Sequence, residues 1–113
     1  MDIIILKIAS EFSRTPGARY ENEGKFSGES FRKNLLSPRL RGAIKAGKQL
    51  VVNLDGTAGY GTSFLEEAFG GLIRENISLE DIKKYLKIIS SEDPSYIDEI
   101  KEYIDDAAKN LQS

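Results

Sequence analysis

The sequence predicts an α/β fold in which about three helices pack mainly on one face of a small mixed sheet of about four strands. The main observation is an alternation along the chain. Apolar, partly β-branched segments of strand length alternate with longer segments whose apolar residues recur at helical spacing. Such alternation is typical of a mostly parallel sheet with right-handed crossovers. The uncovered face of the sheet would leave room for a partner.

The strand predictions depend on runs of β-branched and aromatic residues. We expect strands over 2–9, 50–54 and 85–90, and a short strand over 18–21 that would form a hairpin with the first. The central run, from Leu50 to Leu54, is apolar without alternation. It therefore suits a strand that is covered on both faces.

Three longer helices are expected between and after these strands. Ser27 can cap the first, Gly47 can end it, and Pro38 would bend or restart it. The second helix is expected over 62–73. Asp93 precedes a proline at the first helical position of the third, whose apolar stripe predicts packing on the core.

Length and composition indicate one domain over residues 1–113. The chain has no cysteine and no histidine, which excludes disulfides, thiolate nucleophiles, imidazole catalysis and the usual zinc sites. The apolar run over 3–6 is too short for a signal peptide or a membrane span, so we expect a cytoplasmic protein that does not bind membranes. No nucleophile–base pair stands out, and we predict no enzymatic activity, no cofactor and no metal site.

Charge is unevenly distributed along the chain. Basic residues prevail up to Gln49 and acidic residues after it. Two interpretations stay open: a basic face for an acidic partner, which would include Arg19 and Arg32, or a chance distribution over exposed helix surfaces. Nucleic-acid binding is not expected, because the sequence lacks an aromatic and basic recognition run.

The candidate functional stretch is the connection from the central strand to the helix over 62–73. Its glycines, which can adopt positive φ or allow close approach, are Gly56, Gly59 and Gly61. Backbone N–H groups and the helix dipole favour negative charge at the start of the helix. Thr62 or Ser63 can cap the helix, or can act as a phosphorylation switch there.

Known phosphate-binding loops fit this connection poorly. A Walker loop needs a lysine where Gly61 stands, and a dinucleotide fingerprint needs a glycine where Phe64 stands. Asp55 ends the strand and belongs to the candidate partner or ligand loop.

Tyr60, in the same loop, is either an aromatic anchor for a partner or a lid over the core. Glu66 and Glu67 are neighbours on the helix, point in different directions and are expected to face water.

The longest motif, 51–56 together with 61–72, resembles the signature of the STAS-like domain family of unknown function. Shorter stretches that resemble the same family are Gly17–Arg19, Ser27–Phe31 and Leu36–Pro38. The resemblance implies a STAS-like fold. It also implies a non-catalytic interaction module similar to anti-sigma factor antagonists, with a histidine-kinase-like ATPase as a candidate partner.

In those antagonists the phosphorylatable serine lies at the start of the helix after a central strand. Their pattern falls here on 61–65, with Gly61 in place of its aspartate and Phe64 in place of its glycine. The resemblance therefore implies Thr62 and Ser63 as the switch candidates, while these two departures weaken the match.

Two hypotheses of different classes follow. The leading one is a protein-interaction module that docks on its partner through the 56–63 loop and the exposed side of the helix over 62–73. The alternative is a small-ligand, anion or nucleotide sensor that binds at the N-terminus of this helix, with Arg19 or Arg32 contributing charge. Formation of a homo-oligomer stays open.

Overall fold

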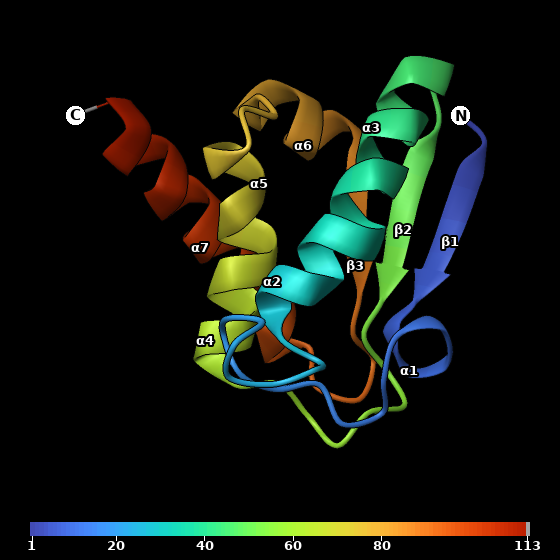
Figure 1. The fold of residues 1–113 in the computed structure, drawn as a ribbon. Helices are drawn as coiled ribbons and strands as arrows, with labels where there is room; N and C mark the ends of the chain where they lie inside the picture. Colours follow the sequence, from blue (N-terminus) through green and yellow to red (C-terminus); the bar gives the residue numbers. More distant parts are fainter. Residues whose placement is uncertain (113) are drawn as a thin grey trace.

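The computed structural model describes residues 1–112 and contains a three-stranded parallel sheet in the order β1–β2–β3 (Figure 1). The strands are β1 (Ile3–Lys7), β2 (Gln49–Asn53) and β3 (Leu86–Ile89). Ile5, Val51 and Lys87 lie side by side in the register. Because β2 lies between the other two strands, β1 and β3 each have one free edge.

The prediction of about four strands in a mixed sheet is wrong, since the sheet has three strands and all are parallel. The expected strand over 18–21 does not form. Ala18 has a φ of 69°, outside the extended region. The carbonyls of Ala18 and Arg19 accept hydrogen bonds of 3.0 Å from the N–H groups of Gly28 and Glu29. This segment therefore pairs with the start of a helix instead of joining the sheet.

The helical segments form two long continuous helices, two short helices and a C-terminal helix. They are α1 (Ile8–Glu11), α2 (Gly28–Phe31), η1 (Arg32–Leu36), α3 (Ser37–Ala46), α4 (Thr62–Leu65), η2 (Glu66–Gly70), α5 (Gly71–Arg74), α6 (Leu79–Tyr85) and α7 (Ser95–Gln112). We call α2–η1–α3 the first long helix and α4–η2–α5 the central helix. Each contains a π-helical turn in its middle, η1 or η2.

The first long helix begins and ends as predicted. Ser27 Oγ accepts a hydrogen bond of 3.0 Å from the N–H of Ser30, and Gly47 ends the helix with a φ of 69°. The π turn η1 ends at Leu36, two residues before Pro38, whose missing N–H and ring are incompatible with regular α-helical bonding. The chain thus continues past the proline as one helix.

The helices lie on one face of the sheet, as predicted (Figure 1). The strand side chains that face the helices are buried in the core, and they include Leu6, Leu50, Val52 and Leu86. On the opposite face Ile3, Ile5 and Ile89 are 55%, 54% and 40% exposed. Three fully buried phenylalanines, Phe31, Phe64 and Phe69, fill the space between the two long helices. Within residues 1–112, none of the helices combines the length and the apolarity needed to cross a membrane.

Candidate functional site

The connection between β2 and the central helix leaves the carboxyl edge of the sheet. Gly56 and Gly59 have φ values of 90° and 122°, which only glycine adopts without strain. A Cβ at Gly56 would lie 3.2 Å from that of Ala9, and a Cβ at Gly59 would lie 3.3 Å from the hydroxyl of Tyr96. Gly61 has an ordinary φ of −78° and open surroundings. Two of the three predicted glycines are therefore required by the backbone.

Asp55 joins this connection to the loop that follows β3. Its carboxylate accepts hydrogen bonds from the N–H groups of Ser91, at 3.2 Å, and Glu92, at 3.0 Å. In return, Glu92 Oε1 accepts the N–H of Gly56 at 2.6 Å. The two loops at the carboxyl edge are thus bound to each other, and Asp55 holds them together.

Tyr60 packs over the core. Its hydroxyl donates a hydrogen bond of 2.7 Å to the carbonyl of Leu54, and its ring lies edge-on to that of Tyr96 at 5.3 Å. Its ring centre is also 5.7 Å from that of Phe64. Burial raises the pKa of Tyr60 to about 12, because the phenolate would lose its hydration. These contacts support the interpretation of Tyr60 as a lid and not as a free anchor.

The start of the central helix is exposed and has no side-chain cap. Gly61 is the N-cap residue, and the predicted capping by Thr62 or Ser63 is wrong, since both residues lie inside the first turn. Both are exposed. Within the described part of the chain, their hydroxyls make no hydrogen bond. Two free hydroxyls therefore lie where a helix favours negative charge.

A hollow of about 250 Å³ lies beside the connection, between Tyr60, Tyr96 and the loop after β3. Three carboxylates line it, those of Asp55, Glu92 and Asp93. These negative charges disfavour an anion in this hollow. Within residues 1–112, neither these three carboxylates nor any other three lie close enough together to hold a metal ion.

Arg32 is the centre of a buried ionic network between the two long helices. Its Nη1 lies 2.6 Å from Glu67 Oε2, and its Nε lies 2.6 Å from Glu75 Oε2. Arg32 is 9% exposed and Glu67 7%, so the prediction that Glu67 faces water is wrong. Burial disfavours the charged guanidinium, but the bonds to Glu67 and Glu75 outweigh this effect and raise the pKa of Arg32. Arg32 is therefore not part of an exposed basic face.

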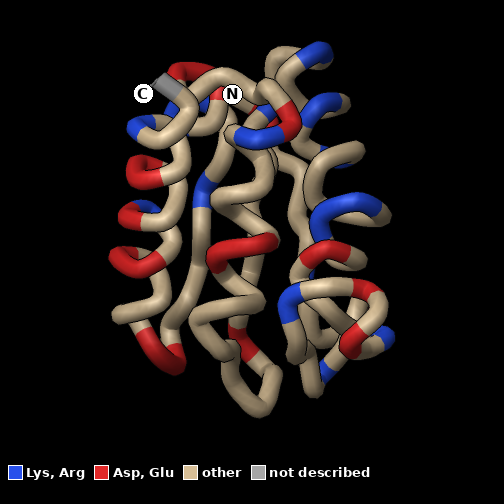
Figure 2. The backbone as a smooth tube through the Cα atoms, turned by 60° about the vertical axis from the view of Figure 1, so that its left-hand side comes forward, with Lys and Arg blue, Asp and Glu red and all other residues tan. Residues whose placement is uncertain are grey.

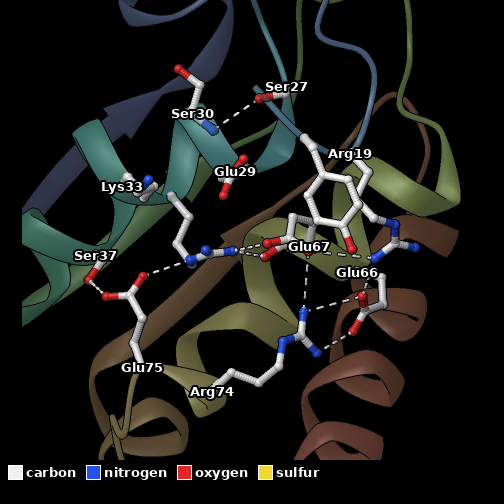
Figure 3. A network of polar contacts seen from close by, with 12 residues as sticks. Arg19, Ser27, Glu29, Ser30, Lys33, Ser37, Glu66, Glu67, Arg74 and Glu75 are labelled. Carbon is white, nitrogen blue, oxygen red and sulfur yellow. Dashed lines mark hydrogen bonds and ion pairs between the residues drawn. The ribbon is translucent and has the colours of Figure 1, made fainter. Parts of the chain in front are cut away.

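Arg19 and Arg74 bind the outer end of the same network (Figure 3). Both guanidiniums bond to Glu66, and the Arg74 contact is 2.8 Å long. Partial burial disfavours ionisation of Glu66, but the bonds from Arg74 and Arg19 outweigh it and lower the pKa of this carboxyl. The Arg19 side chain is 29% exposed, so of the two predicted arginines only Arg19 reaches the surface.

Glycines inside the helices make room for this network. A Cβ at Gly71 would lie 2.1 Å from Arg32 Nη1, and a Cβ at Gly70 would lie 2.6 Å from Glu66 Oε2. Sequence reasoning missed the role of Glu67 and Glu75. The adjacent glycines were the available signal, because such a pair within a helix indicates close packing.

The uneven charge of the sequence is also visible in three dimensions. Figure 2 shows acidic residues spaced along α7 and basic residues along the first long helix, on opposite sides of the molecule. Several of these bases are paired, as Arg39 is with Glu11 and Arg41 with Glu75. The part of the basic surface that is free for a partner is therefore smaller than the sequence alone indicates.

Taken together, these features define an α/β domain with a one-sided parallel sheet and an exposed helix start at its carboxyl edge. The family of STAS-like domains of unknown function (DUF4325) matches residues 27–96. The chain belongs to this family. The comparison with curated proteins gave no significant match, and neither did the comparison with solved structures.

Proposed function

We propose that this protein is a non-catalytic, cytoplasmic regulatory module that docks on a protein partner. Its docking surface would consist of residues 56–63 and the exposed side of the central helix. The observation that carries this proposal is the exposed, uncapped start of that helix, with Thr62 and Ser63 free at its first turn. Membership in a STAS-like family of unknown function is consistent with such a role.

The same observation supports a phosphorylation switch at Thr62 or Ser63. A phosphate there would accept hydrogen bonds from the unpaired N–H groups of the helix start and would interact favourably with its dipole. The nearest acidic side chain one turn on, Glu66, is already neutralised by Arg19 and Arg74. Repulsion between the phosphate and this carboxylate is thereby reduced. The added charge, close to two units, would change which surface a partner accepts.

The resemblance to anti-sigma factor antagonists suggests a histidine-kinase-like ATPase as the partner. A kinase of this kind could both bind the surface and phosphorylate it. The alternative function, an anion or nucleotide sensor, has less support. The adjacent hollow is lined by carboxylates, and the guanidinium of Arg32 is buried in an internal network.

Binding and phosphate transfer can be tested together with a purified histidine-kinase-like ATPase. We expect incubation with ATP to add a phosphate to Thr62 or Ser63, detected by mass spectrometry, and to weaken binding measured by calorimetry. Ser63→Asp should weaken binding without phosphorylation, and Ser63→Ala should not. The matched control is Ser10→Asp, which adds the same charge at an exposed position in α1.

The outcomes separate the two parts of the proposal. Binding without a phosphate on Thr62 or Ser63 would contradict the proposed phosphorylation switch, whereas the proposed docking surface would be retained. Equal weakening by Ser63→Asp and Ser10→Asp would show that net charge and not the helix start controls binding, and would contradict the proposed surface.

A further inference from the structure

The free edge of β3 offers backbone groups to another strand. The carbonyl of Ile89 accepts the N–H of Leu54 at 2.8 Å, so this residue faces β2. Because successive residues of a strand face opposite sides, the N–H and C=O of Ile88 point to the free edge. Within residues 1–112, neither group bonds to a segment outside the sheet. The edge therefore has an unused donor and an unused acceptor, the feature by which sheets recruit a further strand.

An apolar groove of about 430 Å³ lies beside this edge, between β3, α6 and α7. The isoleucines and leucine that line it are Ile82, Leu86, Ile88, Ile97, Ile100 and Ile104. Ile97 is 38% exposed, although it belongs to the stripe by which α7 packs on the core. The α7 helix packs mainly on the central helix and leaves the groove open next to β3. The groove thus lies next to the place where a further strand of the sheet would pair with β3, on the side of the helices.

The rim of the groove is basic. Lys83, Lys87 and Lys101 line it, together with one acid, Asp105, which lies 3.8 Å from Lys83. In the part of the chain that the structure describes, Lys87 and Lys101 have no ion-pair partner. Lys87 points to the open face of the sheet, opposite to the inward-facing Ile88. An added strand would therefore meet apolar side chains on one face and positive charge on the other.

We propose that β3 accepts an extended segment of a partner protein as a fourth strand, with apolar and acidic residues in alternation. Its apolar side chains would fill the groove, its backbone would bond to Ile88, and its acidic side chains would lie beside Lys87. A second copy of this chain suits the edge less well. Two-fold antiparallel pairing of β3 strands would place the Lys87 side chains of both copies on the same face, directly opposite or diagonal to each other, and like charges at such neighbouring positions are unfavourable.

This surface is separate from the helix start, so the inference goes beyond the proposed function. The test uses a fluorescent peptide of about eight residues, the length of an ordinary strand, that alternates glutamate with valine or isoleucine. We expect it to bind at least about tenfold more tightly than the same peptide with lysine in place of glutamate. A version N-methylated on its central residues should bind as weakly as the lysine peptide, because it cannot pair with the strand edge.

Two variants test the location. Lys87→Glu should weaken binding of the acidic peptide, whereas Lys45→Glu, an equal charge change at an exposed position in α3, should not. Hydrogen exchange at the amide of Ile88 should slow when the acidic peptide is present. Circular dichroism of both variants checks that they remain folded.

The proposal is overturned by equal binding of the acidic and N-methylated peptides, by unchanged exchange at Ile88, or by equal effects of the two lysine variants. It is also overturned if the protein forms a dimer in solution that Lys87→Glu dissociates, since the edge would then serve a second copy. Ser63→Asp should leave peptide binding unchanged. A negative result for the β3 edge can therefore be distinguished from a negative result for the docking surface at the helix start.

Discussion

The guanidinium of Arg32 lies 2.6 Å from the carboxylate of Glu67, and it fits there because Gly71 has no side chain. The contact joins the π turn of the first long helix to the π turn of the central helix. Both charged groups are buried, so each depends on the other for the interactions that replace water. The exposed start at Thr62 belongs to the second of these two helices.

Removing one partner of this pair should destabilise the protein strongly. Glu67→Met leaves Arg32 buried with only one carboxylate, and we expect a loss of about 3 kcal/mol in the free energy of unfolding. Arg32→Met should cost a similar amount. The double variant should lose clearly less than the sum of the two, because no unpaired charge remains buried at this contact. Urea unfolding of the four proteins gives the coupling energy.

An exposed pair provides the control for this cycle. Lys33 and Glu21 lie 3.9 Å apart with half of each side chain in water, and Lys33→Met should change stability by less than about 0.5 kcal/mol. Strictly additive effects of Arg32→Met and Glu67→Met would show that the buried contact contributes no coupling.

Two glycine-to-alanine substitutions should have opposite effects. At Gly71 the new methyl group would lie 2.1 Å from Arg32 Nη1, and we expect a loss of about 1–3 kcal/mol from displacement of the network. Gly42 lies on the exposed side of α3 with open space around it, so Gly42→Ala should stabilise by about 0.5–1 kcal/mol through helix propensity. Thermal unfolding of both variants measures the contrast. Stabilisation by Gly71→Ala would mean that the network is not held as tightly as the structure shows.

Substitution by alanine should change the free energy of unfolding at a capping serine and leave it nearly unchanged at a free serine. Ser27 is fully buried and accepts the N–H of Ser30, so Ser27→Ala should cost about 1 kcal/mol of stability. Ser63 is exposed and makes no cap bond, so Ser63→Ala should be neutral within about 0.5 kcal/mol. Denaturant unfolding of Ser27→Ala and Ser63→Ala measures the two changes in the free energy of unfolding. A large loss for Ser63→Ala would indicate that its hydroxyl does stabilise the helix start, which would weaken its assignment as a free switch residue.

Tyr60 should make stability depend on alkaline pH. Its pKa is raised from 10.0 to about 12 in the folded protein, so folding favours the neutral phenol. The stabilisation is fully present below the unfolded pKa and is lost as the pH rises from 10.0 towards about 12. Tyr60→Phe should remove this part of the alkaline loss and cost about 1 kcal/mol at neutral pH through the bond to Leu54. Urea unfolding at neutral and alkaline pH measures both effects, and an unchanged alkaline slope in Tyr60→Phe would contradict the assignment.

The sequence by itself determined the class of fold and most helix boundaries. Ser27 and Gly47 mark helix ends as predicted, because a hydroxyl that accepts a backbone N–H and a glycine with positive φ act within a few residues of the chain. The one-sided sheet was likewise predictable, since it follows from strand and helix alternation with right-handed crossovers. The motif that resembles the STAS-like family likewise consists of residues that are close together in the sequence.

Only the tertiary structure decided the number of strands, the uncapped position of Thr62 and Ser63, and the burial of Arg32 and Glu67. The segment over 18–21 has a strand-like composition, but its carbonyls bond to a helix start that comes later in the chain. Arg32 and Glu67 are 35 residues apart in sequence, and their contact depends on how two helices pack against each other. No local sequence pattern predicts this contact between residues that are distant in the chain. The free energy of burying each charge is set by the groups that surround it after folding.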